Sequence, residues 1–309
     1  MTGLDFGTLV LGGNVFGWTA DERESFGVLD AFVAAGGRSI DTADVYSSWA
    51  PGNSGGESEA IIGRWLASRG GRDRVTIATK VYSLETRPGL SAANIKAAVD
   101  DSLARLHSDY IDLYYAHRDD ETVPQEEYLA AFDDLVKAGK VREIGASNFS
   151  PERLRSADAL AHANALTPFT VAQDRWSLVE RDIEHEHVAA LEELGLVELP
   201  YSSLASGFLT GKYRPGQDVD SVRSGTAKAY LEKPYSADLL TALDEIAAAR
   251  GVSVTAVSLA WLRVQPTVGA PIASARTVEQ LPALVESMTL ELADDEVARL
   301  SGITAPVTV

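Results

Sequence analysis

The sequence predicts an α/β fold, specifically a closed (β/α)8 barrel of the TIM-barrel type. Eight short apolar runs alternate with amphipathic stretches along nearly the whole chain, and some, such as Ile111–Tyr115, are apolar almost throughout. Strands of that kind are typical of a parallel sheet buried by helices. An open, doubly wound sheet is the alternative, but no Gly-x-Gly-x-x-Gly motif follows the first expected strand.

The strands and helices are expected in strict alternation. The expected strands are Thr8–Gly12, Arg38–Thr42, Val75–Lys80, Tyr110–Tyr115, Val141–Ser147, Thr170–Gln173, Leu196–Tyr201 and Thr267–Ala273. The expected helices are Asp21–Ala35, Glu57–Ser68, Ser91–Leu106, Gln125–Ala138, Pro151–Ala163, Glu186–Leu194, Asp238–Arg250 and Ser253–Val264. In the first of these helices Phe26, Leu29 and Val33 share one face, which is the spacing of an amphipathic helix.

Three helix starts carry local signals. Ser150 and Pro151 supply an N-cap hydroxyl and a proline at the first helical position. Asp21 and Ser54 each stand three residues before a glutamate, which is the spacing of a capping box.

The repeat loosens after the seventh expected strand. Residues Ser202–Ser236 are rich in Gly, Ser and Pro and exceed an ordinary connection, so we expect a lid or binding loop there. Two helices follow this loop, so one is an addition to the repeat, and a further helix, Glu291–Leu300, is expected outside the barrel. No low-complexity linker interrupts the chain, so residues 1–309 are expected to form a single barrel domain.

Composition narrows the functional class. The chain is 45% hydrophobic and has no cysteine, which argues against a disordered or disulfide-stabilised protein. Its net charge of -18, from 27 Lys and Arg against 45 Asp and Glu, repels nucleic acid and anionic lipid, so neither partner is expected. An anionic cofactor must therefore meet a local cluster of basic groups and backbone N–H donors.

Targeting and metal signals are also missing from the sequence. Met1–Gly7 resembles no signal peptide and no run of about 18 apolar residues occurs, so we expect a cytoplasmic enzyme, as a monomer or a homo-oligomer. His185 and His187 are two residues apart, which separates them by about 200° around a helix. No third ligand accompanies them, so no metal site is predicted.

Four polar residues follow or end neighbouring expected strands. Asp41 and Tyr46 come after the second strand, Lys80 ends the third and His117 follows the fourth. Because the active site of a (β/α)8 barrel lies at the carboxyl ends of its strands, we expect these side chains to converge.

The set suits proton donation to a carbonyl oxygen that gains negative charge. We expect the Lys80 ammonium to lower the pKa of the Tyr46 phenol, because a nearby cation favours the ionised form. Asp41 would hold the ammonium in place, and His117 would orient the carbonyl oxygen through a hydrogen bond.

Longer motifs around these residues resemble the aldo-keto reductase superfamily. The motifs are Asp41–Tyr46, Ala78–Lys80, Tyr110–His117, Gly145–Phe149 and Leu204–Tyr213, and the resemblance runs over nearly the whole chain. It implies an enzyme that passes a hydride from a reduced nicotinamide, usually NADPH, to an aldehyde or ketone. On this sequence Tyr46 would be the acid, with Asp41, Lys80 and His117 around it.

The resemblance also implies where the cofactor is bound. Ser147, Asn148 and Gln173 would hold the nicotinamide carboxamide, and Tyr201 would stack on the ring. The loop around the pyrophosphate would supply backbone N–H groups and one ammonium from Ser202, Leu204, Ala205, Gly207, Leu209 and Lys212. Ser274, Arg276 and Gln280 follow the eighth strand near a helix start, where a ribose 2′-phosphate would bind. Ala283 and Leu284 replace the Glu-Asn pair that often contacts adenine, so NADH is the alternative cofactor.

Aromatic residues are candidates for the substrate wall. Phe16 and Trp18 follow the first strand, and Trp49 lies in the loop after Tyr46. Two other functions remain open at this stage. The same fold serves in cofactor-sensing regulatory subunits with little turnover, and barrel hydrolases use paired carboxylates. Asp112 lies in mid-strand, however, which argues against its acting together with Asp41.

Overall fold

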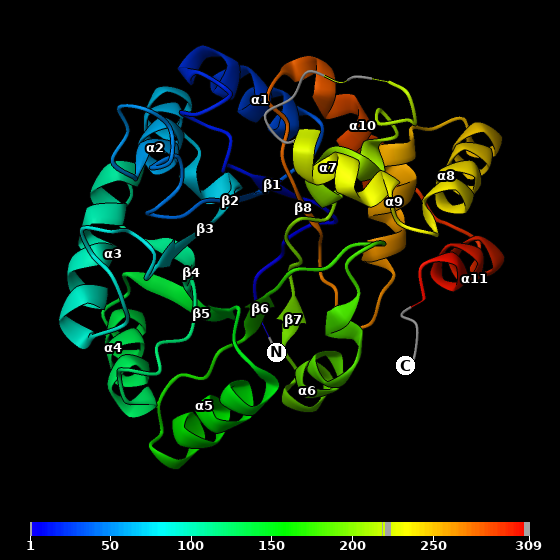
Figure 1. Ribbon diagram of the computed structural model, residues 1–309. Helices are drawn as coiled ribbons and strands as arrows, with labels where there is room; N and C mark the ends of the chain where they lie inside the picture. The colour runs from blue at the N-terminus through cyan, green and yellow to red at the C-terminus, as the bar shows by residue number, and fades with distance from the viewer. Residues whose placement is uncertain (1, 218, 220–223, 306–309) are drawn as a thin grey trace.

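Eight parallel strands form the centre of the molecule in a computed structural model that describes residues 2–217, 219 and 224–305 (Figure 1). The strands are β1 (Val10–Gly12), β2 (Ser39–Asp41), β3 (Thr76–Val81), β4 (Ile111–Ala116), β5 (Val141–Ser147), β6 (Val171–Gln173), β7 (Val197–Glu198) and β8 (Ile272–Ala273). Strands β1 to β7 pair in their order along the chain, and β1 also pairs with β8, so the order is that of a (β/α)8 barrel. The predicted fold class is confirmed.

The barrel closes between β7 and the chain that leads into β8. The Glu198 N–H donates to the Thr267 carbonyl, the Gly269 N–H to the Glu198 carbonyl and the Ile272 N–H to the Pro200 carbonyl, each over 2.9 Å. β7 and β8 are shorter than the predicted Leu196–Tyr201 and Thr267–Ala273. Pro200 and Pro271 explain the difference, because a proline has no N–H to donate to a strand ladder.

Helices surround the strands on the outside (Figure 1). The helices between successive strands are α1 (Glu22–Ala34), α2 (Glu57–Arg69), α3 (Ala92–Leu106), α4 (Gln125–Lys137), α5 (Pro151–Ala163), α6 (Glu186–Leu194) and α9 (Val254–Arg263), and α10 (Leu281–Val285) packs between α9 and α1. Short 3-10 helices are η1 (Arg72–Arg74), η2 (Asp182–Glu184), η4 (Val278–Gln280) and η5 (Glu286–Met288). The additions to the repeat are α8 (Ser236–Arg250) and α11 (Asp294–Ile303), which pack on each other.

In the described part of the chain no single helix is long and apolar enough to cross a membrane. Only α8 and α9 taken together reach that length and composition, and they are bent by 98°.

The long segment after β7 contains helices that its composition did not predict. Residues Ala205–Thr210 form a 3-10 helix, η3, and Ser224–Leu231 form α7, which packs against η3. Ser206 and Gly207 have positive φ values of 57° and 94° inside η3, so the chain kinks there. Residues 218 and 220–223 of this expected loop lie outside the described residues.

The predicted caps are found at two of three helix starts. The Asp21 carboxylate accepts from the Glu24 N–H at 2.8 Å, and the Ser150 hydroxyl accepts from the Arg153 N–H at 3.2 Å. Ser54 does not cap α2. That helix begins after Gly56, at φ 84°, and the Glu57 carboxylate accepts from the Ser54 N–H instead. A glycine in the left-handed conformation displaces the hydroxyl from the capping position.

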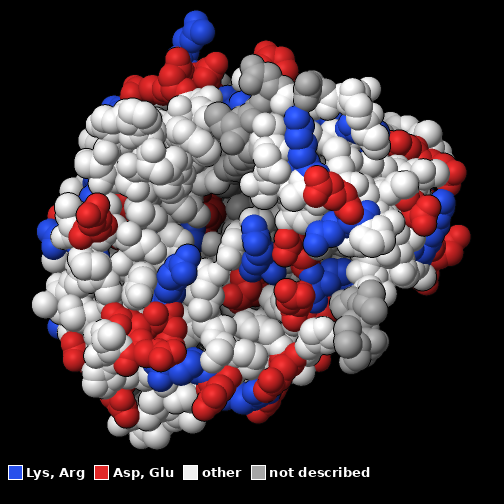
Figure 2. All heavy atoms as spheres, in the orientation of Figure 1, with Lys and Arg blue, Asp and Glu red and all other residues white. Residues whose placement is uncertain are grey.

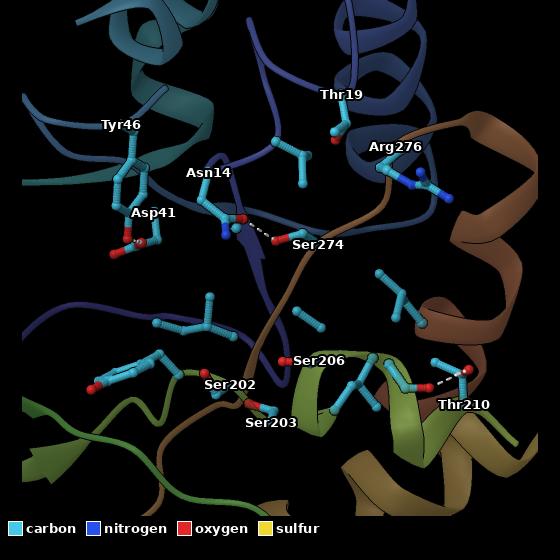
Figure 3. A pocket seen from close by; sticks show the side chains of 18 of the residues that line it. Asn14, Thr19, Asp41, Tyr46, Ser202, Ser203, Ser206, Thr210, Ser274 and Arg276 are labelled. Atoms are coloured by element: carbon cyan, nitrogen blue, oxygen red, sulfur yellow. Dashed lines mark hydrogen bonds between the residues drawn. The ribbon is translucent and has the colours of Figure 1, made fainter. Parts of the chain in front are cut away.

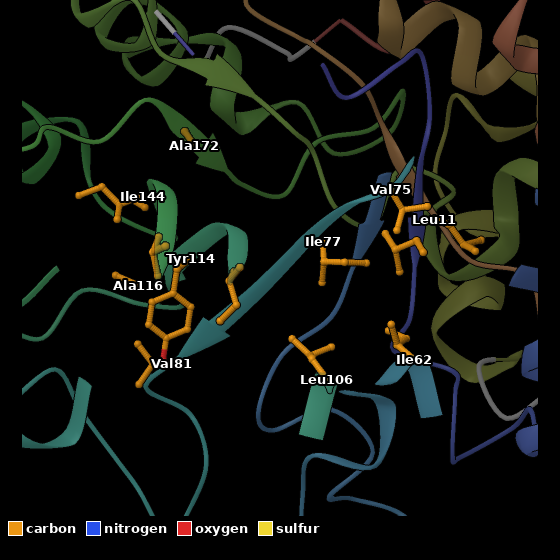
Figure 4. Close-up of a cluster of buried hydrophobic side chains, with 14 of the residues drawn as sticks. Leu11, Ile62, Val75, Ile77, Val81, Leu106, Tyr114, Ala116, Ile144 and Ala172 are labelled. Carbon is orange, nitrogen blue, oxygen red and sulfur yellow. The ribbon is translucent and has the colours of Figure 1, made fainter. Parts of the chain in front are cut away.

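Alternate residues of each strand face opposite sides of the sheet. One hydrophobic core therefore lies inside the barrel, and another lies between the strands and the surrounding helices. Ala78 and Leu113 point into the barrel, while Ile77 and Tyr114 pack outward against the helices. Figure 4 shows the outward cluster, in which side chains from the strands meet Ile62 of α2 and Leu106 of α3. This alternation leaves the inward side chains at the carboxyl strand ends free for chemistry.

Gly63→Ala is expected to destabilise the barrel by about 1 to 3 kcal/mol, the usual range for overpacking. A Cβ at Gly63 would lie 2.0 Å from the Arg105 carbonyl oxygen, so α2 and α3 would have to separate. Gly302→Ala in α11 is the matched control, because nothing lies within 4 Å of its Cβ position. Urea unfolding of both variants measures the difference. Equal midpoints would contradict the close approach of the two helices.

Candidate active site

A cleft of about 550 Å³ opens at the carboxyl ends of the strands. Tyr46 and Asp41 lie at one end of it, and Arg276 and Thr210 lie at the other, with Asn14 and Ser274 joined by a hydrogen bond between them (Figure 3). The surface is hollowed near its centre, and both basic and acidic side chains lie around the hollow (Figure 2). The cleft is thus elongated, with a different chemistry at each end.

The four residues predicted to be catalytic converge at one end of the cleft. The Lys80 ammonium donates to both carboxylate oxygens of Asp41 at 2.7 Å, to the Thr42 carbonyl at 2.8 Å and to the Tyr46 hydroxyl at 3.0 Å. The Tyr46 hydroxyl donates to Asp41 at 3.2 Å. The His117 ring centroid lies 6.1 Å from that of Tyr46. Lys80 is fully buried, whereas Tyr46, Asp41 and His117 border the cleft.

The pKa of Tyr46 is raised well above 10.0, first by burial and then by the Asp41 carboxylate. The predicted lowering of this pKa by Lys80 is therefore wrong, because burial and Asp41 both favour the protonated phenol. Burial also lowers the pKa of Lys80, and the Asp41 carboxylate opposes that shift. The phenol thus stays protonated and can act as a proton donor.

His117 is kept neutral. Burial lowers its pKa well below 6.5, and the charges of Lys80 and Arg118 act in the same direction. Its Nδ1 atom is buried and has no hydrogen-bond partner among the described residues. In the tautomer that leaves Nδ1 without a proton, Nε2 carries the hydrogen and can donate it. His117 can therefore offer an N–H to a substrate oxygen.

The three residues predicted to hold a nicotinamide carboxamide and Tyr201, predicted to stack on its ring, form one hydrogen-bonded group. The Asn148 amide donates to the His117 carbonyl at 3.0 Å and to the Ser147 hydroxyl at 2.9 Å, and it accepts from the Tyr201 hydroxyl at 2.7 Å. Gln173 donates to the Asp41 carboxylate at 2.9 Å. All four line the cleft.

The backbone of Asn148 is also fixed by Asp174, which follows β6. Its φ is 57°, and its N–H donates to the Asp174 carboxylate at 2.9 Å. The second oxygen of Asp174 lies 2.9 Å from His187 Nε2, and the Asp174 N–H donates to Glu198 at 2.7 Å. His187, for which no metal site was predicted, thus supports the turn at Asn148 through Asp174.

The loop residues predicted to bind a pyrophosphate are only partly placed at the cleft. Ser202, Leu204, Gly207 and Lys212 line the cleft, whereas the side chains of Ala205 and Leu209 are buried. The N–H groups of Ala205, Gly207 and Leu209 donate to the carbonyls of Ser202 and Leu204. These three N–H groups are bonded within the segment, because it folds into η3.

The far end of the cleft offers two cations without carboxylate partners. Among the described residues, neither Arg276 nor Lys212 forms an ion pair, and both line the cleft. Gln280 accepts from the Arg276 N–H at 3.0 Å, which orders the turn before η4. An elongated cleft with amide and hydroxyl groups at one end and cations without carboxylate partners at the other has the groups that a nicotinamide dinucleotide needs.

The three aromatic residues predicted for the substrate wall differ in position. Trp18 borders the cleft, and Trp49, 48% exposed, contacts it edge-on with ring centroids 5.6 Å apart. Trp49 also approaches Tyr46, at 6.1 Å between centroids. Phe16 is fully buried in the core and does not line the cleft, so this part of the prediction fails.

Sequence reasoning missed several residues of the cleft. They are Asn14, Val15, Thr19, Arg118, Ser206, Thr210 and Thr255. Asn14 and Arg118 could have been found, because each stands just past a strand. Thr255 carries no such signal, since it reaches the cleft from the first turn of α9.

The hydrolase alternative finds no pair of free carboxylates among the described cleft residues. Asp41 is bound to Lys80, and Asp112 is buried between Arg72 at 2.7 Å and Arg142 at 2.8 Å. Asp112 also accepts from the Ile77 N–H near the amino ends of β3 and β4, away from the cleft.

A phenol set beside an ammonium at the strand ends of a (β/α)8 barrel points to a class of protein, the oxidoreductases that reduce carbonyl groups. The chain belongs to the aldo/keto reductase family, whose family model matches residues 6–305. Members use NAD(P)H in general and act on small carbonyl compounds, so the chain is an oxidoreductase of this kind.

Individual relatives cover nearly the full chain. It is 35% identical to "Uncharacterized oxidoreductase YrpG" of Bacillus subtilis, over 97% of this chain and 92% of that protein. It is 32% identical to the norsolorinic acid reductase stcV of Emericella nidulans, over 99% of this chain and 79% of that protein. It is 30% identical to the "Putative aryl-alcohol dehydrogenase AAD14" of Saccharomyces cerevisiae, over 97% of this chain and 84% of that protein.

A buried carboxyl group lies behind the site. Asp44, two residues before Tyr46, is 1% exposed, and neither carboxyl oxygen has a hydrogen-bond partner among the described residues. Burial, and then the nearby Glu59 carboxylate, raise the pKa of Asp44 from 3.8 to about 8. Asp44 is therefore a neutral acid at pH 7, which spares the interior an uncompensated charge.

Replacing Asp44 by Asn should make stability less dependent on pH. Between pH 4 and pH 8 the folded protein keeps a proton on Asp44 that the unfolded chain releases, since its pKa is about 8 when folded and 3.8 otherwise. Rising pH thus costs the wild type up to about 1.4 kcal/mol per pH unit. Urea unfolding at pH 5 and pH 8 should show a smaller loss in the variant. Parallel losses would show that Asp44 ionises normally.

Proposed function

We propose that the chain reduces an aldehyde or ketone to an alcohol with NADPH, and that Tyr46 supplies the proton. The observation that carries this proposal is the Tyr46 hydroxyl, protonated and held 3.0 Å from the Lys80 ammonium at the end of a cleft. The bound nicotinamide supplies the hydride. Side chains of the protein supply the proton, stabilise the phenolate and orient the carbonyl.

Tyr46 releases its proton to the substrate oxygen as negative charge grows there. Lys80 then stabilises the phenolate oxygen it already contacts, and the Asp41 carboxylate keeps the ammonium aimed at that oxygen. Neutral His117 donates an N–H that orients the carbonyl before transfer. Trp18 and Trp49, on the same side of the cleft as Tyr46, border the space for the substrate.

Tyr46→Phe should lower kcat/KM for an aldehyde by about 10²- to 10⁴-fold, the usual contribution of a general acid. Binding of NADPH, measured by fluorescence titration, should change little, because the phenol acts on the reacting oxygen. Tyr110→Phe, at the start of β4 at the other end of the barrel, is the control and should keep wild-type rates. A Tyr46→Phe variant with nearly wild-type turnover would refute the assignment.

A panel of aldehydes with NADPH separates this function from that of a cofactor-sensing subunit. Tight NADPH binding without oxidation of NADPH by any aldehyde would favour the regulatory alternative. Steady oxidation that depends on the aldehyde would favour the reductase.

Selection of NADPH is assigned to Arg276. Its guanidinium has no carboxylate partner among the described residues and borders the end of the cleft remote from Tyr46 (Figure 3). A charge-assisted bond to a 2′-phosphate is worth about 1.5 to 3 kcal/mol.

Arg276→Glu is therefore expected to raise KM for NADPH by at least about tenfold and to leave KM for NADH nearly unchanged. Arg74→Glu in η1, which makes the same change of charge at the amino ends of the strands, should alter neither. Steady-state kinetics with both cofactors decide the point. An equal rise in KM for NADPH and for NADH would show that Arg276 does not bind the 2′-phosphate.

A further inference from the structure

Arg118 is a cleft residue that the proposed reaction does not use. It follows β4 directly after His117, its side chain is exposed, and it lines the cleft. Within the described ranges it forms no ion pair, in a chain with 45 acidic and 27 basic residues. An unpaired guanidinium in so acidic a protein is a site open to an anion.

Three carboxylates in and around the site are engaged elsewhere. Asp119, the next residue, binds Arg153 through two bonds of 2.5 and 2.9 Å. Asp41 is taken by Lys80 and Asp174 by His187. Each of these carboxylates already has a cationic or imidazole partner. The Arg118 guanidinium, which lines the cleft, is therefore available to an anionic ligand.

The backbone that carries Arg118 is fixed on both sides. The His117 N–H donates to the Val81 carbonyl at 2.9 Å, and the His117 carbonyl accepts from the Asn148 amide at 3.0 Å. On the other side Asp119 is tied to Arg153. A ligand that meets Arg118 therefore has only the side chain to order, which lowers the entropic cost of binding.

The charge of Arg118 acts on the substrate half of the cleft. It helps to lower the pKa of His117, the residue proposed to orient the substrate carbonyl. The other free cations of the cleft, Lys212 and Arg276, come from the segments after β7 and β8. The phosphates of a dinucleotide thus have their own cations, and Arg118 is left for the substrate.

We propose that Arg118 binds an anionic group of the substrate, so that the preferred substrates are aromatic aldehydes or ketones that carry a carboxylate. The aromatic part would lie against Trp18 and Trp49, whose rings meet edge-on at the cleft rim. This inference rests on the proposed carbonyl reduction and adds the class of substrate to it.

Two benzaldehydes of nearly the same shape test the proposal. 4-Carboxybenzaldehyde carries the anion, and 4-formylbenzamide is its neutral counterpart. The wild type should prefer the carboxylate by about tenfold in kcat/KM, mainly through KM, and the preference should shrink as salt is added. Arg118→Gln should abolish the preference and Arg118→Lys should restore part of it. Arg74→Gln in η1, which removes an exposed arginine outside the cleft lining, should leave it unchanged.

The outcomes separate this inference from the proposed function. Equal rates for both aldehydes in the wild type and in Arg118→Gln would overturn the anion subsite and leave the reductase standing. A rise in KM for NADPH in Arg118→Gln, with the substrate ratio unchanged, would assign Arg118 to the cofactor and also overturn it. If no aldehyde is reduced, the proposed function fails. Quenching of tryptophan fluorescence by 4-carboxybenzaldehyde against 4-formylbenzamide then still decides for or against the subsite.

Discussion

The buried ion pair between Lys80 and Asp41 is the constraint on which the site depends. Removing two charges from water costs several kcal/mol per ion, so such a pair persists only when its remaining hydrogen-bonding groups are also satisfied. Lys80 meets this condition through both oxygens of Asp41 and the Thr42 carbonyl, and Asp41 also accepts from Gln173. These residues belong to or follow β2, β3 and β6, so one pair ties three strands of the barrel to a single geometry.

The alternation of a β-strand makes the core and the chemistry parts of the same arrangement. In β3, Ile77 and Val81 pack outward against the helices, while Ala78 and Lys80 face inward. A shift of register by one residue would bury the ammonium among helices and send a methyl group into the cleft. The hydrophobic pattern that sets the fold therefore also sets which polar groups reach the reacting atoms.

The fold and the catalytic cluster could be predicted because both follow from local order along the chain. Alternating strands and helices define the barrel, and the rule that sites form at carboxyl strand ends points to Asp41, Tyr46, Lys80 and His117. The direction of the Tyr46 pKa shift could not be predicted, since it depends on burial and on the distance to Asp41. Nor could the burial of Phe16, because a residue just past a strand can face either the cleft or the core.

The distribution of cations explains how a protein of net charge -18 can attract anions. Many of its arginines are consumed in ion pairs on the outer helices, such as Arg64 with Glu22 and Arg250 with Glu296. Arg118, Lys212 and Arg276 face the cleft without carboxylate partners among the described residues. Because low-dielectric walls focus the field of such charges, the local potential in the cleft can be positive while the far field is negative. The acidic exterior then opposes nonspecific binding of polyanions, and only an anion small enough to enter the cleft meets the free cations.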